Sequence, residues 1–168
     1  RLESLPSKVL RRTNSAGGDV TVTETGADGG TTTLFPDGTR IDRTLQADPW
    51  LKGRLILGSQ TLTSPGGIAI TQSLVRSVEK TADTGALTHL TDTLDFDGRR
   101  LVLDYDVPTR TSRMVSAEGI VEEVELDEAG RPVRIGFGPG IDPILEAYDG
   151  EGRMLLQSQG ARSWSYSY

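Results

Sequence analysis

The segment Tyr148-Asp149-Gly150-Glu151-Gly152-Arg153 has a counterpart 22 residues upstream, Leu126-Asp127-Glu128-Ala129-Gly130-Arg131. Both segments contain a large apolar residue, Asp, two variable residues, Gly and Arg. Asp at the first corner of a type I turn can accept hydrogen bonds from backbone N–H groups. Gly three positions later can adopt the left-handed conformation through which a bulge joins the return strand. The pattern predicts two hairpin turns with four structural residues, Asp127, Gly130, Asp149 and Gly152.

The segments that flank these turns alternate apolar and polar residues. Apolar side chains occupy every second position of residues 132–137, and aromatic ones do so near the end of residues 161–168. Side chains of a strand point to opposite faces in alternation, so each segment is expected to form one half-buried strand. Aromatic side chains prefer the buried face, although a platform that stacks on sugars or bases is the alternative. The residues expected to be inward-facing or binding aromatics are Tyr148, Trp164, Tyr166 and Tyr168.

The Tyr-Asp-x-x-Gly-Arg motif at residues 148–153 resembles the tyrosine-aspartate (YD) repeat of Rhs proteins, insecticidal toxin-complex proteins and teneurins. Residues 126–131 resemble a copy with Leu in place of Tyr, and Tyr166-Ser167-Tyr168 resembles the start of a third copy. This spacing is that of an internal repeat with two strands and two turns in each unit. The resemblance covers residues 116–168 of the 168-residue chain.

This resemblance implies a section of a β-sheet shell in a secreted or cell-surface protein. Such a section is structural, is not an enzyme and needs no cofactor, and its main partner is the rest of the same polypeptide. Shells of this family enclose a toxin or form adhesion scaffolds, so a toxin domain, a cell-surface protein or a carbohydrate is an expected partner. Some Rhs proteins cleave themselves at an Asp-Pro-x-Gly motif; Asp142-Pro143-Ile144-Leu145 lacks the Gly, so this activity is not expected.

The composition is typical of a turn-rich β protein and excludes several other classes. Glycine makes up 20 of the 168 residues, more than the usual ~7%. The net charge is −6 and no basic cluster exceeds two residues, which argues against nucleic-acid binding. The absence of cysteine excludes disulfides and thiolate metal sites, and no apolar run reaches the ~20 residues of a membrane helix. The chain is long enough to bury a core.

Hairpin signals continue upstream of the repeats. We expect an irregular start through residue 18, longer hairpins up to residue 115, YD-type repeats in residues 116–168, and one continuous sheet through both parts. Because the chain starts at Arg1 and ends within a motif, we expect it to be a piece of a longer polypeptide. The predicted fold is an all-β antiparallel meander of about twelve strands. The residues alone do not distinguish between a barrel, a sandwich and a wrapping sheet. The resemblance implies a wrapping sheet.

Two candidates for chemistry stand outside the repeats. His89 is the only histidine and no G-x-S-x-G elbow accompanies it, so a position on a strand face is favoured over a catalytic one. Carboxylates beside a turn could bind Ca²⁺, but Asp95-x-Asp97-Gly98 supplies only half of a calcium loop, which favours solvated side chains. A carboxylate pair for glycoside hydrolysis is left open. The acidic cluster is Asp92, Asp95, Asp97, Asp104 and Asp106.

Three functions therefore stand in order of preference. The first is the structural shell section, the second a β module that binds carbohydrate or protein, and the third a small β-barrel hydrolase. Exposure of the aromatic side chains would favour the second function over the first. A pocket that groups His89 with carboxylates would favour the third. No catalytic residue and no metal ligand is assigned.

Overall fold

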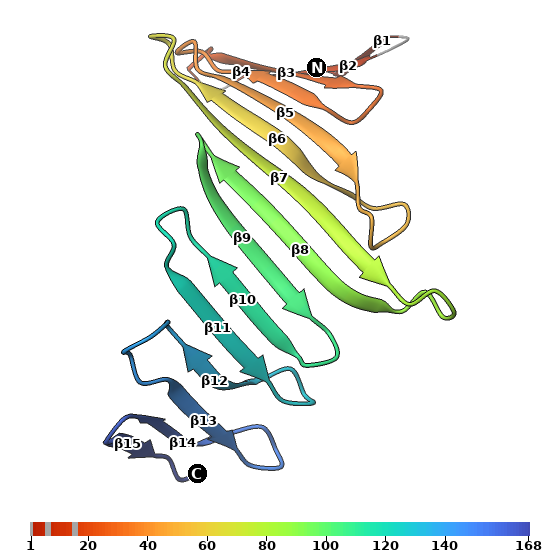
Figure 1. The fold of residues 1–168 in the computed structure, drawn as a ribbon. Helices are drawn as coiled ribbons and strands as arrows, with labels where there is room; N and C mark the ends of the chain where they lie inside the picture. Colours follow the sequence, from red (N-terminus) through yellow and green to blue (C-terminus); the bar gives the residue numbers. More distant parts are fainter. Residues whose placement is uncertain (1, 6–7, 15–16) are drawn as a thin grey trace. The chain divides into compact units, whose positions relative to one another are not determined.

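The computed structural model describes residues 2–5, 8–14 and 17–168, which form fifteen β-strands and no helix. Each strand is hydrogen-bonded to its neighbours in the sequence, so the order in the sheet is the order in the chain (Figure 1). Among the described residues, the first and last strands, β1 and β15, stand at the two ends of this order. The predicted all-β antiparallel meander is confirmed, with a somewhat larger number of strands than expected.

The residues divide into two compact units, and each is described by itself. Unit 1 comprises residues 1–75 and 94–99, and unit 2 comprises residues 76–93 and 100–168. The strands that lie wholly or mostly in unit 1 are β1 (Leu2–Leu5), β2 (Lys8–Asn14), β3 (Val20–Gly26), β4 (Thr31–Leu34), β5 (Arg40–Ala47), β6 (Leu55–Thr63) and β7 (Ala69–Lys80). The remaining strands are β8 (Leu87–Phe96), β9 (Arg99–Asp106), β10 (Thr111–Val115), β11 (Val121–Leu126), β12 (Pro132–Gly136), β13 (Ile144–Tyr148), β14 (Met154–Gln159) and β15 (Arg162–Ser165).

The expected irregular start is wrong for the residues described there. β1 and β2 pair antiparallel, and β2 in turn pairs with β3 from Val9↔Thr25 to Asn14↔Val20. Residues 8–14 show no alternation of apolar and polar side chains. A strand is recognised in the sequence by the contrast between a buried and a solvated face. Where that contrast is missing, the strand is defined by its hydrogen-bonded neighbour and not by its local pattern.

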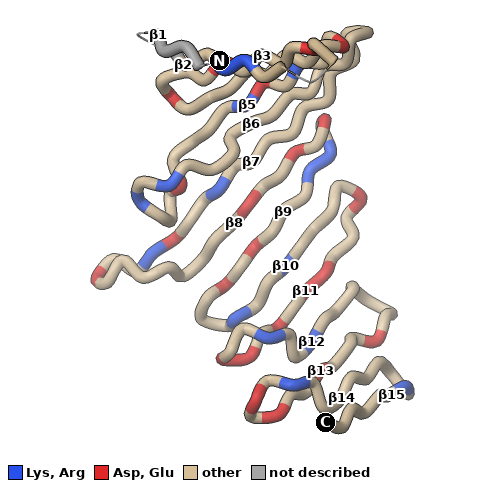
Figure 2. Tube along the Cα trace, turned by 180° about the vertical axis from the view of Figure 1, so that it is seen from behind, with Lys and Arg blue, Asp and Glu red and all other residues tan. Residues whose placement is uncertain are grey.

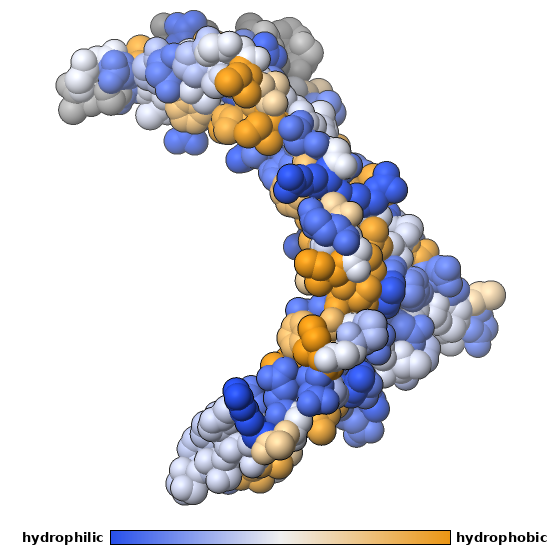
Figure 3. Space-filling view, turned by 60° about the vertical axis from the view of Figure 1, so that its left-hand side comes forward, coloured by the Kyte–Doolittle hydropathy of each residue, from blue (hydrophilic) through white to orange (hydrophobic). Residues whose placement is uncertain are grey.

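The described residues enclose no hydrophobic core. None of their hydrophobic side chains is buried, and the one buried polar residue is Asp48, at 5% exposure. The accessible surface is 11,234 Å², whereas a compact protein of 18.1 kDa exposes ~8,100 Å². In the space-filling view, hydrophobic side chains in orange lie at the surface beside hydrophilic ones in blue (Figure 3). The chain length permits a core, but a single sheet layer has no second layer to bury one against.

The strand register divides the side chains of unit 2 between two different faces. Residues that pair directly across strands share a face. One row of such pairs runs from β9 to β14 through Tyr105, Ser112, Val124, Ile135, Ile144 and Gln159. Together with the neighbouring Leu103–Met114 pair it forms the apolar face of unit 2, whose half-buried apolar members are Leu103, Tyr105, Met114, Val124, Ile135 and Ile144.

The opposite side, the charged face of unit 2, carries ladders of alternating charge. Arg113 pairs with Asp104 on one side and with Glu123 on the other. Arg134 pairs with Glu125, and its Nη1 lies 3.1 Å from Oε1 of Glu125 and 3.6 Å from Oε1 of Glu123. A polar face and an apolar face on one antiparallel sheet are the arrangement of a sheet that is solvated on one side and covered on the other.

Candidate functional site

The two predicted turns share one set of hydrogen bonds. Oδ1 of Asp149 accepts from the backbone N–H groups of Glu151 and Arg153, both at 2.9 Å, and Oδ2 accepts from Nε of Arg153 at 2.8 Å. The backbone N–H of Gly152 donates to the carbonyl of Asp149 at 3.0 Å. Gly152 has a φ of 85°, in the left-handed region that favours glycine. The carboxylate thus holds both the backbone and the final arginine of its turn.

Asp127 makes the corresponding bonds 22 residues upstream. Its Oδ1 accepts from the N–H groups of Ala129 at 2.8 Å and Arg131 at 3.0 Å, and its Oδ2 accepts from Nε of Arg131 at 2.7 Å. Gly130 has a φ of 78°. The pKa of Asp127 is lowered mainly by the hydrogen bond from the Arg131 side chain. The pKa of Asp149 is lowered mainly by the hydrogen bond from the backbone N–H of Arg153. In both turns the hydrogen bonds favour the ionised carboxylate.

The same backbone frame recurs in four further hairpins. In each, the first residue donates to the carbonyl of the fifth, and the N–H of the fourth residue, a glycine, donates back to the carbonyl of the first. Serine takes the place of Asp in two of them. Oγ of Ser116 accepts from the N–H groups of Glu118 and Ile120, both at 3.2 Å, and Oγ of Ser64 accepts from the N–H of Ile68 at 3.0 Å. The turn positions 1 to 5 of the four hairpins are residues 26–30, 35–39, 64–68 and 116–120.

An arginine of each YD-type turn lies over a tyrosine that follows it in the chain. The guanidinium carbon of Arg131 is 4.7 Å from the ring centroid of Tyr148, and that of Arg153 is 5.1 Å from the ring centroid of Tyr168. The Tyr148 hydroxyl donates to Oε2 of Glu146 at 2.7 Å. Burial, followed by this bond to Glu146, raises the pKa of Tyr148 to about 12. The first contact joins two consecutive turns and the second joins the later turn to Tyr168, a role of the arginines that the sequence motif did not reveal.

The aromatic residues near the end of the chain are exposed to solvent. Trp164 is 47% exposed, Tyr166 42% and Tyr168 73%. Trp164 pairs with Gln157 on β14, which pairs with Glu146 on β13, so Trp164 lies on the same side as the apolar face. Because no described hydrophobic side chain is buried, the exposure of these rings is a property of the whole sheet. It therefore does not distinguish a binding platform from a face that is covered in the assembled protein.

His89 lies in a shallow groove of about 360 Å³ on the charged face of unit 2. Its Nε2 is 3.5 Å from Oδ1 of Asp104, and its Nδ1 is 3.9 Å from Oδ2 of Asp106. Arg113 and Glu123 also line the groove. The structure thus brings together the histidine and two of the aspartates, which is the grouping that would favour a hydrolase.

Two threonine hydroxyls beside His89 are already bound to the neighbouring carboxylates. Thr91 donates its hydroxyl proton to Asp104 at 2.7 Å, and Thr109 donates its own to Asp106 at 2.6 Å. The Thr109 side chain is the main cause that lowers the pKa of Asp106, so this carboxylate is a weaker base than an ordinary one. About a third of the His89 side chain is exposed, at 32%. The groove is an open, partly solvated part of a strand face.

The remaining members of the acidic cluster are engaged separately. Asp92 accepts from Nε and Nη2 of Arg76 at 2.7 and 2.6 Å. Asp95 accepts from the N–H of Gly98 at 2.8 Å, and Asp97 occupies the first corner of that turn with a φ of 54°. Within the described residues, no three or more His, Cys, Asp or Glu side chains are grouped so that they could hold a metal ion.

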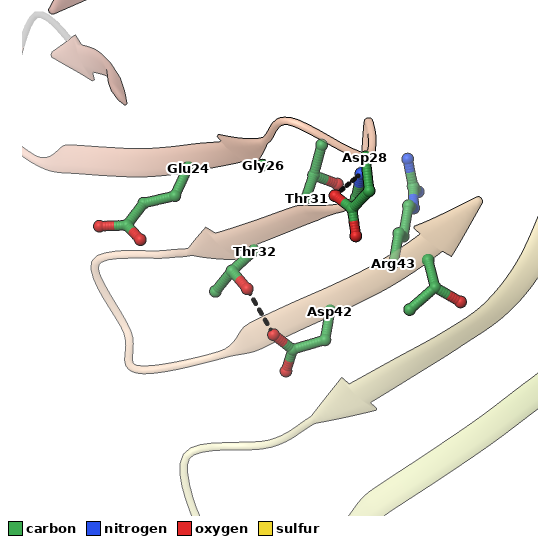
Figure 4. Close-up of a pocket in the computed structure, with 9 residues that line it drawn as sticks. Glu24, Gly26, Asp28, Thr31, Thr32, Asp42 and Arg43 are labelled. Carbon is green, nitrogen blue, oxygen red and sulfur yellow. Dashed lines mark hydrogen bonds between the residues drawn. The ribbon is translucent and has the colours of Figure 1, made fainter. Parts of the chain in front are cut away.

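A second polar groove, of about 320 Å³, lies in unit 1 (Figure 4). Its carboxylates are held by neighbours in their own hairpins: Asp42 accepts from Thr32 at 2.6 Å, and Asp28 accepts from the N–H of Gly30 at 3.0 Å. Arg40 also donates to Asp42 at 2.8 Å and is the main cause that lowers its pKa. Both carboxylates therefore stabilise the hairpins to which they belong.

Charges of both signs are spread along the described part of the chain (Figure 2). Lys and Arg, in blue, are interspersed with Asp and Glu, in red, along the tube (Figure 2). The described part of the chain has no helix of the length and apolarity that crossing a membrane requires. No family model matches the chain, and no curated protein matches it.

Proposed function

We propose that this chain is a non-enzymatic structural section of a YD-repeat β-sheet shell, in which the apolar face of unit 2 is covered and the charged face is solvated. One observation carries the proposal: no described hydrophobic side chain is buried, although half-buried apolar residues line one face of the sheet from β9 to β13. A face of this kind is stable in water only when another layer covers it.

The repeated turns support this reading. Asp127 and Asp149 use the same bonds, and Arg131 and Arg153 each stack on a following tyrosine. Successive hairpins thus contact their neighbours in a recurring way, as the units of a repeat protein do. By the YD resemblance, the parent protein is secreted or at the cell surface, and the covered face belongs to the interior that holds a toxin or to an adhesion scaffold.

The test is to measure how the folded chain binds an apolar dye, anilinonaphthalene sulfonate, and to compare two substitutions at half-buried valines. Val124→Thr lies on the apolar face, and Val121→Thr lies at a paired position on the opposite side of the same strand, β11. We expect strong dye fluorescence that Val124→Thr reduces and Val121→Thr leaves nearly unchanged. A folded chain that does not bind the dye would show that this face is not open, and the proposal would fail.

One observation favours a second function. His89 lies with Asp104 and Asp106 in one groove, as a small hydrolase would require. The threonine hydroxyls already bound to these carboxylates and the open position of the groove argue for the structural role. Hydrolysis of nitrophenyl esters or glycosides that His89→Ala abolishes would support the second function.

A further inference from the structure

We propose that Asp97 is a site of spontaneous covalent modification, at which its side chain cyclises onto the backbone nitrogen of Gly98 and reopens as isoaspartate. This inference goes beyond the proposed function and does not depend on it, because it concerns a turn of unit 1 and not the apolar face of unit 2. Aspartate followed by glycine favours this ring closure, since glycine has no side chain that obstructs its own nitrogen. The chain contains four such pairs, at positions 28–29, 37–38, 97–98 and 149–150.

In three of the four pairs, backbone N–H groups of the same turn hold the aspartate side chain. Oδ1 of Asp28 accepts from the N–H of Gly30 at 3.0 Å, and Oδ1 of Asp37 accepts from the N–H of Thr39 at 2.9 Å. Asp149 accepts from two backbone N–H groups and from an arginine side chain. Each of these carboxylates must leave its bonds before its Cγ can meet the nitrogen of the following glycine.

Asp97 differs from these three residues. Within the described part of the chain, its carboxylate makes no hydrogen bond and no ion pair. Asp97 and Gly98 are both exposed, and a Cβ atom at position 98 would meet no atom within 4 Å. The Asp97 carboxyl group therefore has open space around Gly98 and no bond of its own to give up.

The backbone of this turn is also unfavourable for aspartate. Asp97 and Gly98 connect β8 to β9, with φ values of 54° and 84°. Positive φ suits glycine but is uncommon for a residue that has a side chain. In isoaspartate the chain runs through Cβ and Cγ, which adds one atom to the backbone. The product no longer requires the conformation in which the intact turn holds Asp97.

The reaction balances with water as its one reagent. The Gly98 nitrogen forms a bond to Cγ of Asp97 and loses its proton, while Cγ loses an oxygen as water, and a five-membered succinimide ring closes. Water then adds to one of the two ring carbonyls and breaks its bond to the nitrogen. Opening at the α-carbonyl leaves the chain joined through Cγ, as isoaspartate, and opening at Cγ restores aspartate.

Asp95 is placed to receive the proton that the nitrogen loses. Its Oδ1 accepts from the Gly98 N–H at 2.8 Å. In the turns at Gly29 and Gly38, the glycine N–H donates instead to a backbone carbonyl at 3.0 Å, and a carbonyl oxygen is a far weaker base than a carboxylate. A carboxylate bound to the proton of the attacking nitrogen has the position of a general base.

The experiment follows isoaspartate at all four pairs in the folded 168-residue chain. The chain is kept for weeks at mildly acidic pH, because the oxygen leaves Cγ more readily from a carboxylic acid than from a carboxylate. Tryptic peptides are analysed by electron-transfer fragmentation, since the modified and unmodified peptides have the same mass. One hydrogen bond reduces the population of a free carboxyl group about fivefold, so Asp97 should isomerise at least about fivefold faster than the other three. In concentrated urea, where the turns are lost, the four rates should be similar.

Variants connect the reaction to the two aspartates. Asp97→Glu should remove the fastest signal, because the longer side chain would have to close a six-membered ring, and the matched Asp37→Glu should leave it. Asp95→Asn keeps an oxygen that accepts the Gly98 N–H but removes the base, so it should slow isomerisation at Asp97 in the folded chain and not in urea. Circular dichroism establishes that each variant keeps the β spectrum of the parent chain.

Equal rates at the four pairs of the folded chain, or a faster rate at one of the other three, would overturn the assignment of Asp97. A preference for Asp97 that persists in urea would overturn the role of the turn. An unchanged rate in Asp95→Asn would show that Asp95 is not the base. Failure of the dye test would leave all of these rates as they are, so the proposed function and this inference fail separately.

Discussion

Gly152 in one turn lies against the side chain of Arg131 in the preceding turn: a Cβ atom at position 152 would be 3.2 Å from Nη1 of Arg131. Arg131 is also held by Asp127 and lies over the ring of Tyr148. Gly152 therefore meets two requirements, because its φ of 85° favours glycine and its place beside Arg131 leaves little room for a side chain. This contact couples two hairpins that are 22 residues apart.

We predict that Gly152→Val lowers the free energy of unfolding by about 1–2 kcal/mol or more, because a β-branched residue is strained at positive φ and crowds Arg131. Glu151→Val in the same turn and Gly150→Ala, where a Cβ meets no atom within 4 Å, are the matched controls. Thermal unfolding of the three variants is the measurement. Equal melting temperatures would contradict the turn assignment.

Acid is predicted to weaken the turns. The pKa values of Asp127 and Asp149 are lowered by their bonds within the turn, so these groups stabilise the fold above the unfolded-state value of ~3.9. That contribution is lost as the pH falls through the lowered folded-state pKa. We expect the melting temperature to fall between about pH 5 and pH 2, and Asp149→Asn to lower it at neutral pH and to flatten the acid dependence. An unchanged pH profile in Asp149→Asn would exclude this role.

The stacking of Arg131 on Tyr148 should appear as a coupling energy. In a double-mutant cycle with Arg131→Lys and Tyr148→Leu, the interaction term is expected to be about 0.5–1 kcal/mol. Lys keeps the charge but loses the planar guanidinium that covers the ring. Urea unfolding of the four proteins measures the term. Strict additivity of the two substitutions would show that the contact adds nothing to stability.

Removal of metal ions is predicted to have no effect on the melting temperature. Four of the five carboxylates of the acidic cluster are already bound, by Arg76, Thr91, Thr109 and the N–H of Gly98. A chelator should therefore leave the unfolding curve unchanged. If the chelator shifted the curve by several degrees and Ca²⁺ restored it, the acidic residues would form a calcium site after all.

The fold could be predicted where local chemistry determines it. Asp and Gly at fixed offsets predicted the turns at 127–131 and 149–153, and the alternating pattern between them predicted strands. β2 was missed because its residues lack that alternation and its position depends on pairing with β3. It could not be predicted that the described residues bury no hydrophobic side chain, because a strand pattern shows that one face is to be covered but not what covers it.

The candidate site depended on register in the same way. His89 lies beside Asp104 and Asp106 because β8 and β9 present these side chains on one face, which sequence separation alone does not show. Asp92 does not join them, because it follows Thr91 by one residue on β8 and so lies on the opposite face, where Arg76 binds it. The contacts of Arg131 and Arg153 with later tyrosines arise between hairpins, so they were invisible in the motif of either hairpin.

Sedimentation velocity of the folded 168-residue chain over a wide range of concentrations shows whether the apolar face of unit 2 is built to be covered. With this face and the strand edges open, the chain should associate as its concentration rises, and Val124→Lys should weaken the association. A chain that sediments as a compact monomer at every concentration, with or without Val124→Lys, would contradict the account.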